Sequence, residues 1–323
     1  MAATRSPWLP SRAVIYEHPL AYLIGLEGVA LLRGFIGEYD RDFVEARIAE
    51  VRELLADESL ADAAVAVERV GTVDGYRVWS ATYDDGRNSA FDFDEPVVEE
   101  IVDALPAGVA VDAACGTGRF SALLAARGHR VIGVDSSPDM LARARENVPA
   151  GEFRSGDLGA LPVEDASADL VTCGLALAHV PDLRPAFAEF ARVLRPGGHL
   201  VISDMHPERI ARGAIPTLRD ADGRPGRLPG HRHLVGDYLR AALAVGLELR
   251  RCEEPVLEPA PAAPPATELG PWDVWPWSLA AVVPEAARAA DAGIPVEIIW
   301  HFRRTRLPGP AGGTPRPGRR VIA

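Results

Sequence analysis

The stretch from Val109 to Asp135 constrains the fold of this chain most, because it reads as strand, glycine turn, helix and second strand. The first strand is apolar, as a buried parallel strand is, and it runs into Gly116 and Gly118. Glycines let the chain turn sharply and bring its backbone close to a ligand. Asp135 follows Gly116 by about 20 residues, where a carboxylate can accept both hydroxyls of a ribose. The stretch therefore predicts a nucleotide-binding unit of an α/β fold.

Two classes of cofactor use such a unit. Dinucleotide-binding turns read G-x-G-x-x-G, whereas Ser121 occupies the third glycine position here and no glycine-rich continuation follows. A turn that binds NAD, or that binds nothing, is the alternative interpretation of this stretch taken alone.

The string DAACGTG, from Asp112 to Gly118, resembles motif I of the class I S-adenosylmethionine (SAM) methyltransferases, which usually reads D-x-G-C-G-T-G. Ala114 stands in place of the family's first glycine. Three later strings resemble the same family: SSPDM after Asp135, GDL before Gly159 and LRPGG before His199. Dinucleotide-binding folds do not share the GDL string. The resemblance covers about residues 79–302 and implies SAM as the cofactor and S-adenosylhomocysteine (SAH) as the product.

The resemblance also implies roles for single residues. Tyr83 would help to close the cofactor site, Met140 would lie against the adenine, and Asp157 would accept the adenine amino group. Leu158 would supply a backbone donor. The alternatives are core packing for Met140 and an ordinary packed aromatic for Tyr83. The full set of predicted cofactor-binding residues is Tyr83, Ala114, Cys115, Gly116, Thr117, Gly118, Asp135, Ser136, Met140, Asp157, Leu158, Cys173, Gly174 and Leu175.

Strands, helices and turns alternate from residue 95 to residue 302, which predicts a three-layer, doubly wound α/β fold with a mainly parallel sheet. By the resemblance, this sheet is Rossmann-like and seven-stranded, with an antiparallel hairpin at its edge. In open α/β sheets the ligand lies beyond the carboxyl ends of the strands. Six candidate site residues fall at such ends: Gly116, Asp135, Asp157, Gly174, His179 and His206.

Residues 1–78 read as a mainly helical N-terminal extension. Helices are predicted over 20–35 and 40–56, the second with Asp40 as its N-cap, and a strand or hairpin over 65–78 around its two glycines. Two roles stay open for this extension: a cap over a substrate pocket, or a contact in a homodimer.

The predicted SAM-binding domain of residues 79–304 carries insertions at about 206–232 and 258–294, which read as substrate or lid loops. The second insertion holds three tryptophans, Trp272, Trp275 and Trp277. They could line an aromatic pocket for a flat substrate, or pack the loop onto the domain. Residues 305–323 are rich in proline, glycine and arginine and predict a disordered tail.

The formal net charge of −12 argues against a protein that binds DNA or RNA without sequence preference, because such a protein presents a basic face. A local patch that binds tRNA or a peptide is still compatible with this charge.

The spacing of the three cysteines predicts neither a metal site nor a disulfide. The first 12 residues lack the apolar core of a signal peptide, and the apolar run over 20–36 contains charges. We therefore expect a cytoplasmic protein without a membrane span.

Two histidines are the candidate catalytic bases. His179 follows the predicted fourth strand and His206 the fifth, and imidazole can take up a hydroxyl proton near neutral pH. A structural role is the alternative for each. We predict methyl transfer from SAM to a small molecule, with an oxygen nucleophile of a secondary metabolite favoured. Methylation of carbon or nitrogen, including that of a peptide, and a SAM-binding module without catalysis are the rival predictions.

Overall fold

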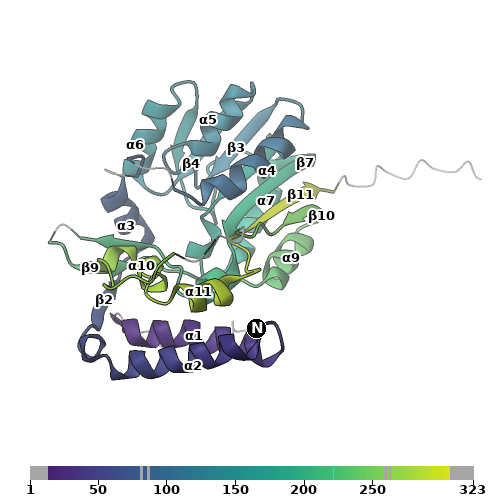
Figure 1. Cartoon of the computed structure of the whole chain (residues 1–323). Helices are drawn as coiled ribbons and strands as arrows, with labels where there is room; N and C mark the ends of the chain where they lie inside the picture. Colours follow the sequence, from purple (N-terminus) through teal and green to yellow (C-terminus); the bar gives the residue numbers. More distant parts are fainter. Residues whose placement is uncertain are drawn as a thin grey trace, which may run out of the picture.

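The computed structural model describes residues 14–80, 83–85, 88–220, 222–257, 261 and 263–305, and within them two β-sheets. The large sheet with its helices forms the upper part of the molecule in Figure 1, and the small sheet lies beside the N-terminal helices in the lower part. The predictions for the first 12 residues and for the tail concern residues that, apart from Thr305, lie outside the described ones.

The large sheet has seven strands in the order β10-β11-β7-β6-β3-β4-β5. Its strands are β3 (Val109–Ala113), β4 (Arg130–Asp135), β5 (Glu152–Ser155), β6 (Ala168–Gly174), β7 (Leu194–Met205), β10 (Leu247–Glu253) and β11 (Glu297–Arg304). The pairs from β7 to β5 are parallel, whereas β11 runs antiparallel to both of its neighbours. This order confirms the predicted doubly wound, mostly parallel sheet with an antiparallel hairpin at its edge.

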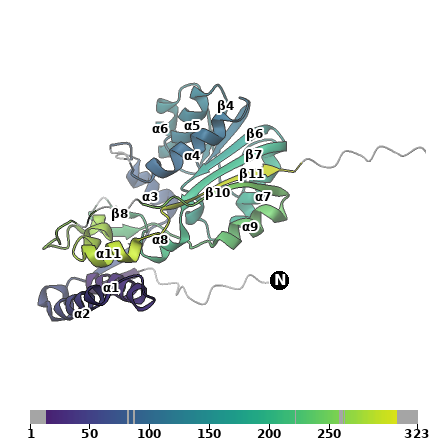
Figure 2. The same cartoon turned by 45° about the vertical axis from the view of Figure 1, so that its right-hand side comes forward.

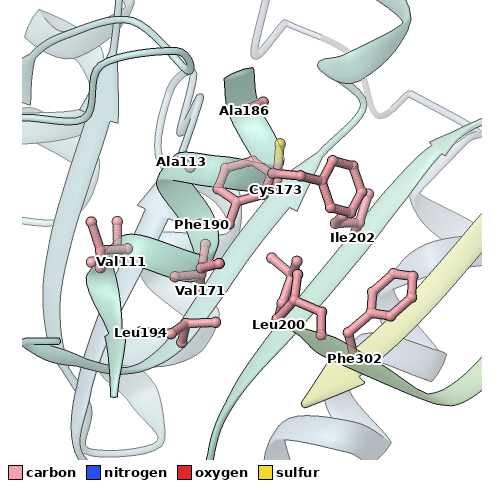
Figure 3. Packing of buried hydrophobic residues seen from close by; sticks show 14 of the residues in the cluster. Val111, Ala113, Val171, Cys173, Ala186, Phe190, Leu194, Leu200, Ile202 and Phe302 are labelled. Atoms are coloured by element: carbon pink, nitrogen blue, oxygen red, sulfur yellow. The ribbon is translucent and has the colours of Figure 1, made fainter. Parts of the chain in front are cut away.

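Helices cover both faces of this sheet because its strands are apolar on both sides. Val111 and Ala113 of β3 point to the face of α7 (Leu183–Val193) and α9 (Val235–Ala244), where they join the core drawn in Figure 3. Ala110 belongs to the core on the other face, under α4 (Phe91–Asp103) and α5 (Arg119–Ala126). The helix α6 (Pro138–Asn147) lies against β4 and β5. Three layers result, as predicted.

The N-terminal region begins with β1 (Val14–Glu17) and two helices, α1 (Pro19–Phe35) and α2 (Arg41–Ala56). Asp40 caps α2 as predicted, since its side chain accepts a hydrogen bond of 2.9 Å from the Phe43 N–H. A short 3-10 turn, η1 (Glu58–Leu60), follows. No helix in the described part of the chain is both long enough and apolar enough to cross a membrane.

The prediction of a strand or hairpin over residues 65–78 is only half right. Residues Val65–Arg69 form β2, but Thr72–Trp79 form a helix, α3. Gly75 is not a turn residue: a Cβ at this position would lie 2.3 Å from Leu228 Cδ2, so the glycine lets α3 approach the neighbouring strands closely. Glycine at a contact and glycine at a turn look alike in a sequence, which explains the error.

The small sheet joins the N-terminal region to the first insertion, in the order β1-β2-β9-β8. The predicted loop over 206–232 therefore contains real elements, namely α8 (Pro207–Ala211), β8 (Thr217–Arg219) and β9 (Pro225–Arg227). Arg227 makes two hydrogen bonds to the Glu17 carboxylate, of 2.6 and 2.9 Å, and Trp272 Nε1 donates a third of 2.8 Å. One carboxylate of β1 thus holds residues from both insertions.

A second hydrophobic core unites the same three segments. Leu23 and Leu26 of α1 pack with Trp272 and Trp275 and with alanines of α11 (Pro284–Asp291). Figure 2 shows α1 beneath α11. The connecting elements are η3 (Trp272–Val274) and α10 (Trp277–Ala280). The N-terminal region and the two insertions therefore form one packed unit, which we call the cap.

The Glu17→Ala change should destabilise the cap strongly. Arg227 is only 5% exposed, and a buried guanidinium that loses its carboxylate costs about 3–5 kcal/mol. The matched control is Glu45→Ala, which breaks an exposed pair with Arg41 and should cost less than about 1 kcal/mol. Denaturant unfolding followed by tryptophan fluorescence measures both, and equal small losses would contradict the description of the cap.

Candidate functional site

The turn after β3 brings the backbone to the carboxyl edge of the sheet. Gly116 and Gly118 have φ angles of 55° and 95°, which glycine adopts without strain. A Cβ on Gly118 would meet no atom closer than Val148 Cγ2 at 3.3 Å, so the positive φ angle, more than crowding, favours glycine there. Ala114 and Leu175 have positive φ angles of 58° and 53°, which strains residues other than glycine. Ala114 lies in the turn and Leu175 directly after β6, whereas Ala166, with a φ angle of 47°, lies in the loop before β6.

Asp135 connects the turn to the end of β4. Its Oδ2 accepts a hydrogen bond of 2.8 Å from the Gly116 N–H, and its Oδ1 accepts one of 2.8 Å from the Ser137 N–H. Burial raises the pKa of Asp135, and these backbone donors act in the opposite direction. A carboxylate oxygen can accept more than one hydrogen bond, so both oxygens keep capacity for a ligand.

A cavity of about 340 Å³ opens beside this carboxylate, within the usual size range of small-molecule sites. It is lined from the sheet side by Asp135, by Asp157 after β5, and by Gly174 at the end of β6. Three residues of α3 line it from the cap side: Thr72, Val73 and Tyr76. The cavity therefore lies between the sheet and the cap.

A second cavity, of about 390 Å³, lies next to the first, since both share Tyr83, Ala114, Gly116, Gly174 and Leu175 in their linings. Cys115, Thr117 and Gly118 line only the second one. Thr117 Oγ1 donates a hydrogen bond of 2.9 Å to Asp84 Oδ1, which holds the segment that contains Tyr83 against the turn.

Arg119 closes one side of the second cavity and is held by a buried acid. Two of its nitrogens donate to the two oxygens of Asp94, each at 2.7 Å, and Ser203 Oγ donates to the same carboxylate at 2.6 Å. The guanidinium also lies 4.0 Å from the ring centroid of Phe91. This network joins α5, α4 and β7 beneath the cavity.

Most of the predicted cofactor-binding residues meet at these two cavities. The first is lined by Tyr83, Ala114, Gly116, Asp135, Ser136, Asp157, Leu158, Gly174 and Leu175, and the second adds Cys115, Thr117 and Gly118. Met140 and Cys173 depart from the prediction. Both are fully buried and line neither cavity, and Cys173 points into the core between the sheet and α7 (Figure 3).

The two candidate bases occupy different environments. His179 ends the 3-10 turn η2 (Leu177–His179) and lines the first cavity. Its Nδ1 lies 2.7 Å from the Pro229 carbonyl oxygen, and its Nε2 lies 3.0 Å from the Tyr76 hydroxyl oxygen. Burial lowers the pKa of His179 below its ordinary value.

His206 is not brought to either cavity. Its Nδ1 accepts a hydrogen bond from the Glu208 N–H at 3.3 Å, which caps α8, and its Nε2 lies 3.2 Å from Glu254 Oε1. The reason is that β7 continues to Met205 and pairs with β11 there, so that His206 begins the first insertion as the N-cap of α8. Of the two predicted bases, the structure therefore brings only His179 to these cavities.

The sequence interpretation missed the contribution of α3, above all Tyr76. A usable signal was that Tyr76 and Trp79 lie three residues apart in the sequence. In the structure their rings meet edge to face, with the ring centroids 5.4 Å apart. Such spacing is typical of one helix face.

The three tryptophans of the second insertion line neither cavity; Trp272 and Trp275 pack in the cap, and Trp277 is exposed.

The residues present fit a nucleoside cofactor. Asp135 offers acceptors for ribose hydroxyls, and Asp157 offers one for an exocyclic amine on the same side of the sheet. The glycine turn leads into α5, whose first N–H groups favour negative charge. Together these features match a ligand with a ribose, a base and an anionic group.

Comparison with known proteins supports this fit. Residues 111–202 match the family described as "Methyltransferase domain". The chain is 44% identical over 114 residues to an uncharacterized 37.1 kDa protein in transposon TN4556 of Streptomyces fradiae, with 33% of each protein covered. It is 37% identical over 124 residues to a malonyl-[acyl-carrier protein] O-methyltransferase of Serratia marcescens, with 38% of this chain and 46% of that protein covered. The chain thus spans less than half the length of these relatives.

Solved structures share the fold. One is a chain in the complex between the Haloferax volcanii Trm112 methyltransferase activator and the putative methyltransferase. It is 22% identical, with a TM-score of 0.53, and the match covers 73% of this chain and 98% of that one. Residues 111–202 are therefore a methyltransferase domain by sequence, and the sheet that holds them has the Rossmann-like fold.

Proposed function

We propose that this protein transfers a methyl group from SAM to a small-molecule acceptor, with an oxygen nucleophile favoured. The observation that carries the proposal is the composition of one cavity. Asp135 and Asp157 line it at the carboxyl edge of the sheet, and His179 lines it beside the cap. Two carboxylates that can accept hydrogen bonds from a nucleoside thus line the same cavity as a candidate general base.

The binding roles follow from the chemistry of each group. Asp135, held by two backbone N–H donors, accepts the ribose hydroxyls, and Asp157 accepts the adenine amino group. Tyr83 lines both cavities, as do Gly116 and Ala114 of the glycine turn. Thr117 and Gly118 face the second cavity, where the amino-acid end of the cofactor is placed in this proposal.

When bound, SAM supplies a methyl group on a sulfonium that is already a good leaving group. The chain then mainly has to align the acceptor with that methyl group and exclude water, which supplies roughly 7–11 kcal/mol of barrier reduction in well-oriented reactions. The cap residues Thr72, Val73 and Tyr76 close the cavity on the acceptor's side. This supports the cap role of the N-terminal extension over the dimer role.

His179 is the proposed base. Its burial lowers its pKa, so the imidazole is neutral near pH 7 and able to take up a proton. An oxygen nucleophile is also favoured by the relative from Serratia marcescens, whose name states O-methylation. A carbon or nitrogen nucleophile, including one on a peptide, and a binding module without catalysis remain the rival proposals.

Asp135→Ala should weaken the binding of SAM and SAH. The loss of a buried acceptor costs about 1–3 kcal/mol, or roughly five- to 150-fold in affinity. Glu164→Ala is the matched control, because Glu164 is an exposed acid of the same domain that lines neither cavity. Isothermal titration calorimetry measures both variants, and tighter binding of NAD than of SAM by the unaltered protein would refute the proposal.

His179→Ala should lower kcat at least roughly tenfold while SAM affinity stays within a few-fold, the low end of the range for general bases. Because the pKa of His179 lies below its ordinary value of about 6.5, its neutral, active form persists above that lowered pKa. As the pH falls, the rate should therefore decline at a lower pH than an unperturbed histidine would give, and the variant should lack this decline. Labelled-methyl transfer to a panel of phenols, alcohols, carboxylic acids and amines measures both rates. Equal turnover in the variant would exclude His179 as the base.

A further inference from the structure

Both ring nitrogens of His179 are already engaged within the protein. A carbonyl oxygen only accepts hydrogen bonds, so the contact of 2.7 Å with Pro229 O requires the hydrogen to be on Nδ1. In the neutral imidazole Nε2 is then an acceptor, and the Tyr76 hydroxyl at 3.0 Å donates to it. A methyl-accepting substrate in the cavity therefore cannot reach either ring nitrogen of His179 without displacing Tyr76.

Tyr76 is held in this position from several sides. Gly75 lets α3 lie directly on Leu228, where any side chain would collide. The Tyr76 ring meets those of Trp79 and His179 edge to face, with centroids 5.4 and 5.6 Å apart. Its hydroxyl oxygen keeps lone pairs after donating to His179, and the residue lines the same cavity as Asp135 and Asp157.

We propose that Tyr76 is a catalytic residue that contacts the acceptor's hydroxyl and relays its proton to His179. This inference rests on the proposed function. In the step, the acceptor oxygen forms a bond to the methyl carbon, and the carbon–sulfur electron pair stays on sulfur. The acceptor's proton passes to the Tyr76 oxygen as the phenolic proton of Tyr76 passes to His179 Nε2. Tyr76 is a phenol before and after, and the imidazolium later releases its proton to solvent.

The electrostatics of the pair suit a relay. Burial raises the pKa of Tyr76 well above its ordinary value, and the nearby Tyr83 and Asp135 raise it further. A free phenolate is therefore disfavoured, and Tyr76 acts only by giving up its own proton as it takes another. Burial also keeps His179 neutral, and its Nε2 already accepts the hydrogen bond along which that proton would move.

The relay gives the N-terminal extension a chemical role. Tyr76 lies in α3, outside the residues 111–202 that match the methyltransferase family. His179 belongs to the sheet domain and Pro229 to the first insertion. The proton path thus crosses from the cap to the sheet domain, and neither part holds it alone.

The first test needs no acceptor. Long-range ¹H–¹⁵N NMR on protein labelled at its histidines, with His179→Ala for assignment, reports which ring nitrogen carries hydrogen. We expect His179 with hydrogen on Nδ1 and a hydrogen-bonded Nε2, and in Tyr76→Phe an Nε2 that has lost this bond. Hydrogen on Nε2 in the unaltered protein would overturn the proposal, because Tyr76 could not then donate to it.

The second test is kinetic and uses labelled SAM with the acceptor panel above. Tyr76→Phe should lower kcat at least about tenfold, and the double variant with His179→Ala should lose no more than the larger single loss, since both residues serve one step. Tyr16→Phe, which removes an exposed phenol, is the control and should keep full turnover. Unchanged or faster turnover in Tyr76→Phe would overturn the relay and leave His179 as a direct base.

Cofactor binding separates failure of the relay from failure of the proposed function. SAM affinity in Tyr76→Phe, measured by calorimetry, should stay within a few-fold of the unaltered protein. If the unaltered protein binds SAM but methylates no member of the panel, proton-bearing oxygen acceptors are contradicted, and the relay falls with them. If Tyr76→Phe loses SAM binding and turnover together, Tyr76 is a cofactor-site residue and the relay is wrong.

Discussion

The pair of hydrogen bonds at Asp135 is the constraint on which the site depends. One carboxylate accepts from Gly116 in the turn after β3 and from Ser137 at the start of α6. It thereby fixes two loops that leave adjacent parallel strands, and it does so at the edge where an open α/β sheet binds its ligand. Ala114 in the same turn and Leu175 after β6 have positive φ angles, so strained backbone borders this carboxylate on both cavities.

The cap depends on a different kind of interaction, in which segments far apart in the chain share one buried charge. Glu17 holds Arg227 and Trp272, and the second core packs α1 against α11. This unit presents α3 to the cavity, so its stability determines where Tyr76 lies relative to His179. A folded cap is thus part of the catalytic arrangement that we propose, and not an appendage to it.

Local patterns in the sequence predicted the sheet domain well, because glycines, carboxylates and strand ends in motif I act within a few residues of one another. They failed where long-range contacts decide. Gly75 looked like a turn because its partner, Leu228, is distant in the chain. His206 follows its strand as expected, but its side chain caps α8 and pairs with the distant Glu254, and it lines neither cavity. Met140 has the motif's spacing, yet its side chain is buried away from both cavities.

The central claim is that the two cavities form one cofactor site whose methyl-bearing end faces Tyr76 and His179. A crystal structure of the protein grown with SAH tests it most directly. The account predicts ribose hydroxyls within hydrogen-bond distance of Asp135, the adenine amine at Asp157, and the sulfur on the side of the cavity lined by Tyr76. SAH bound with its sulfur away from α3, or no SAH between the sheet and the cap, would contradict it.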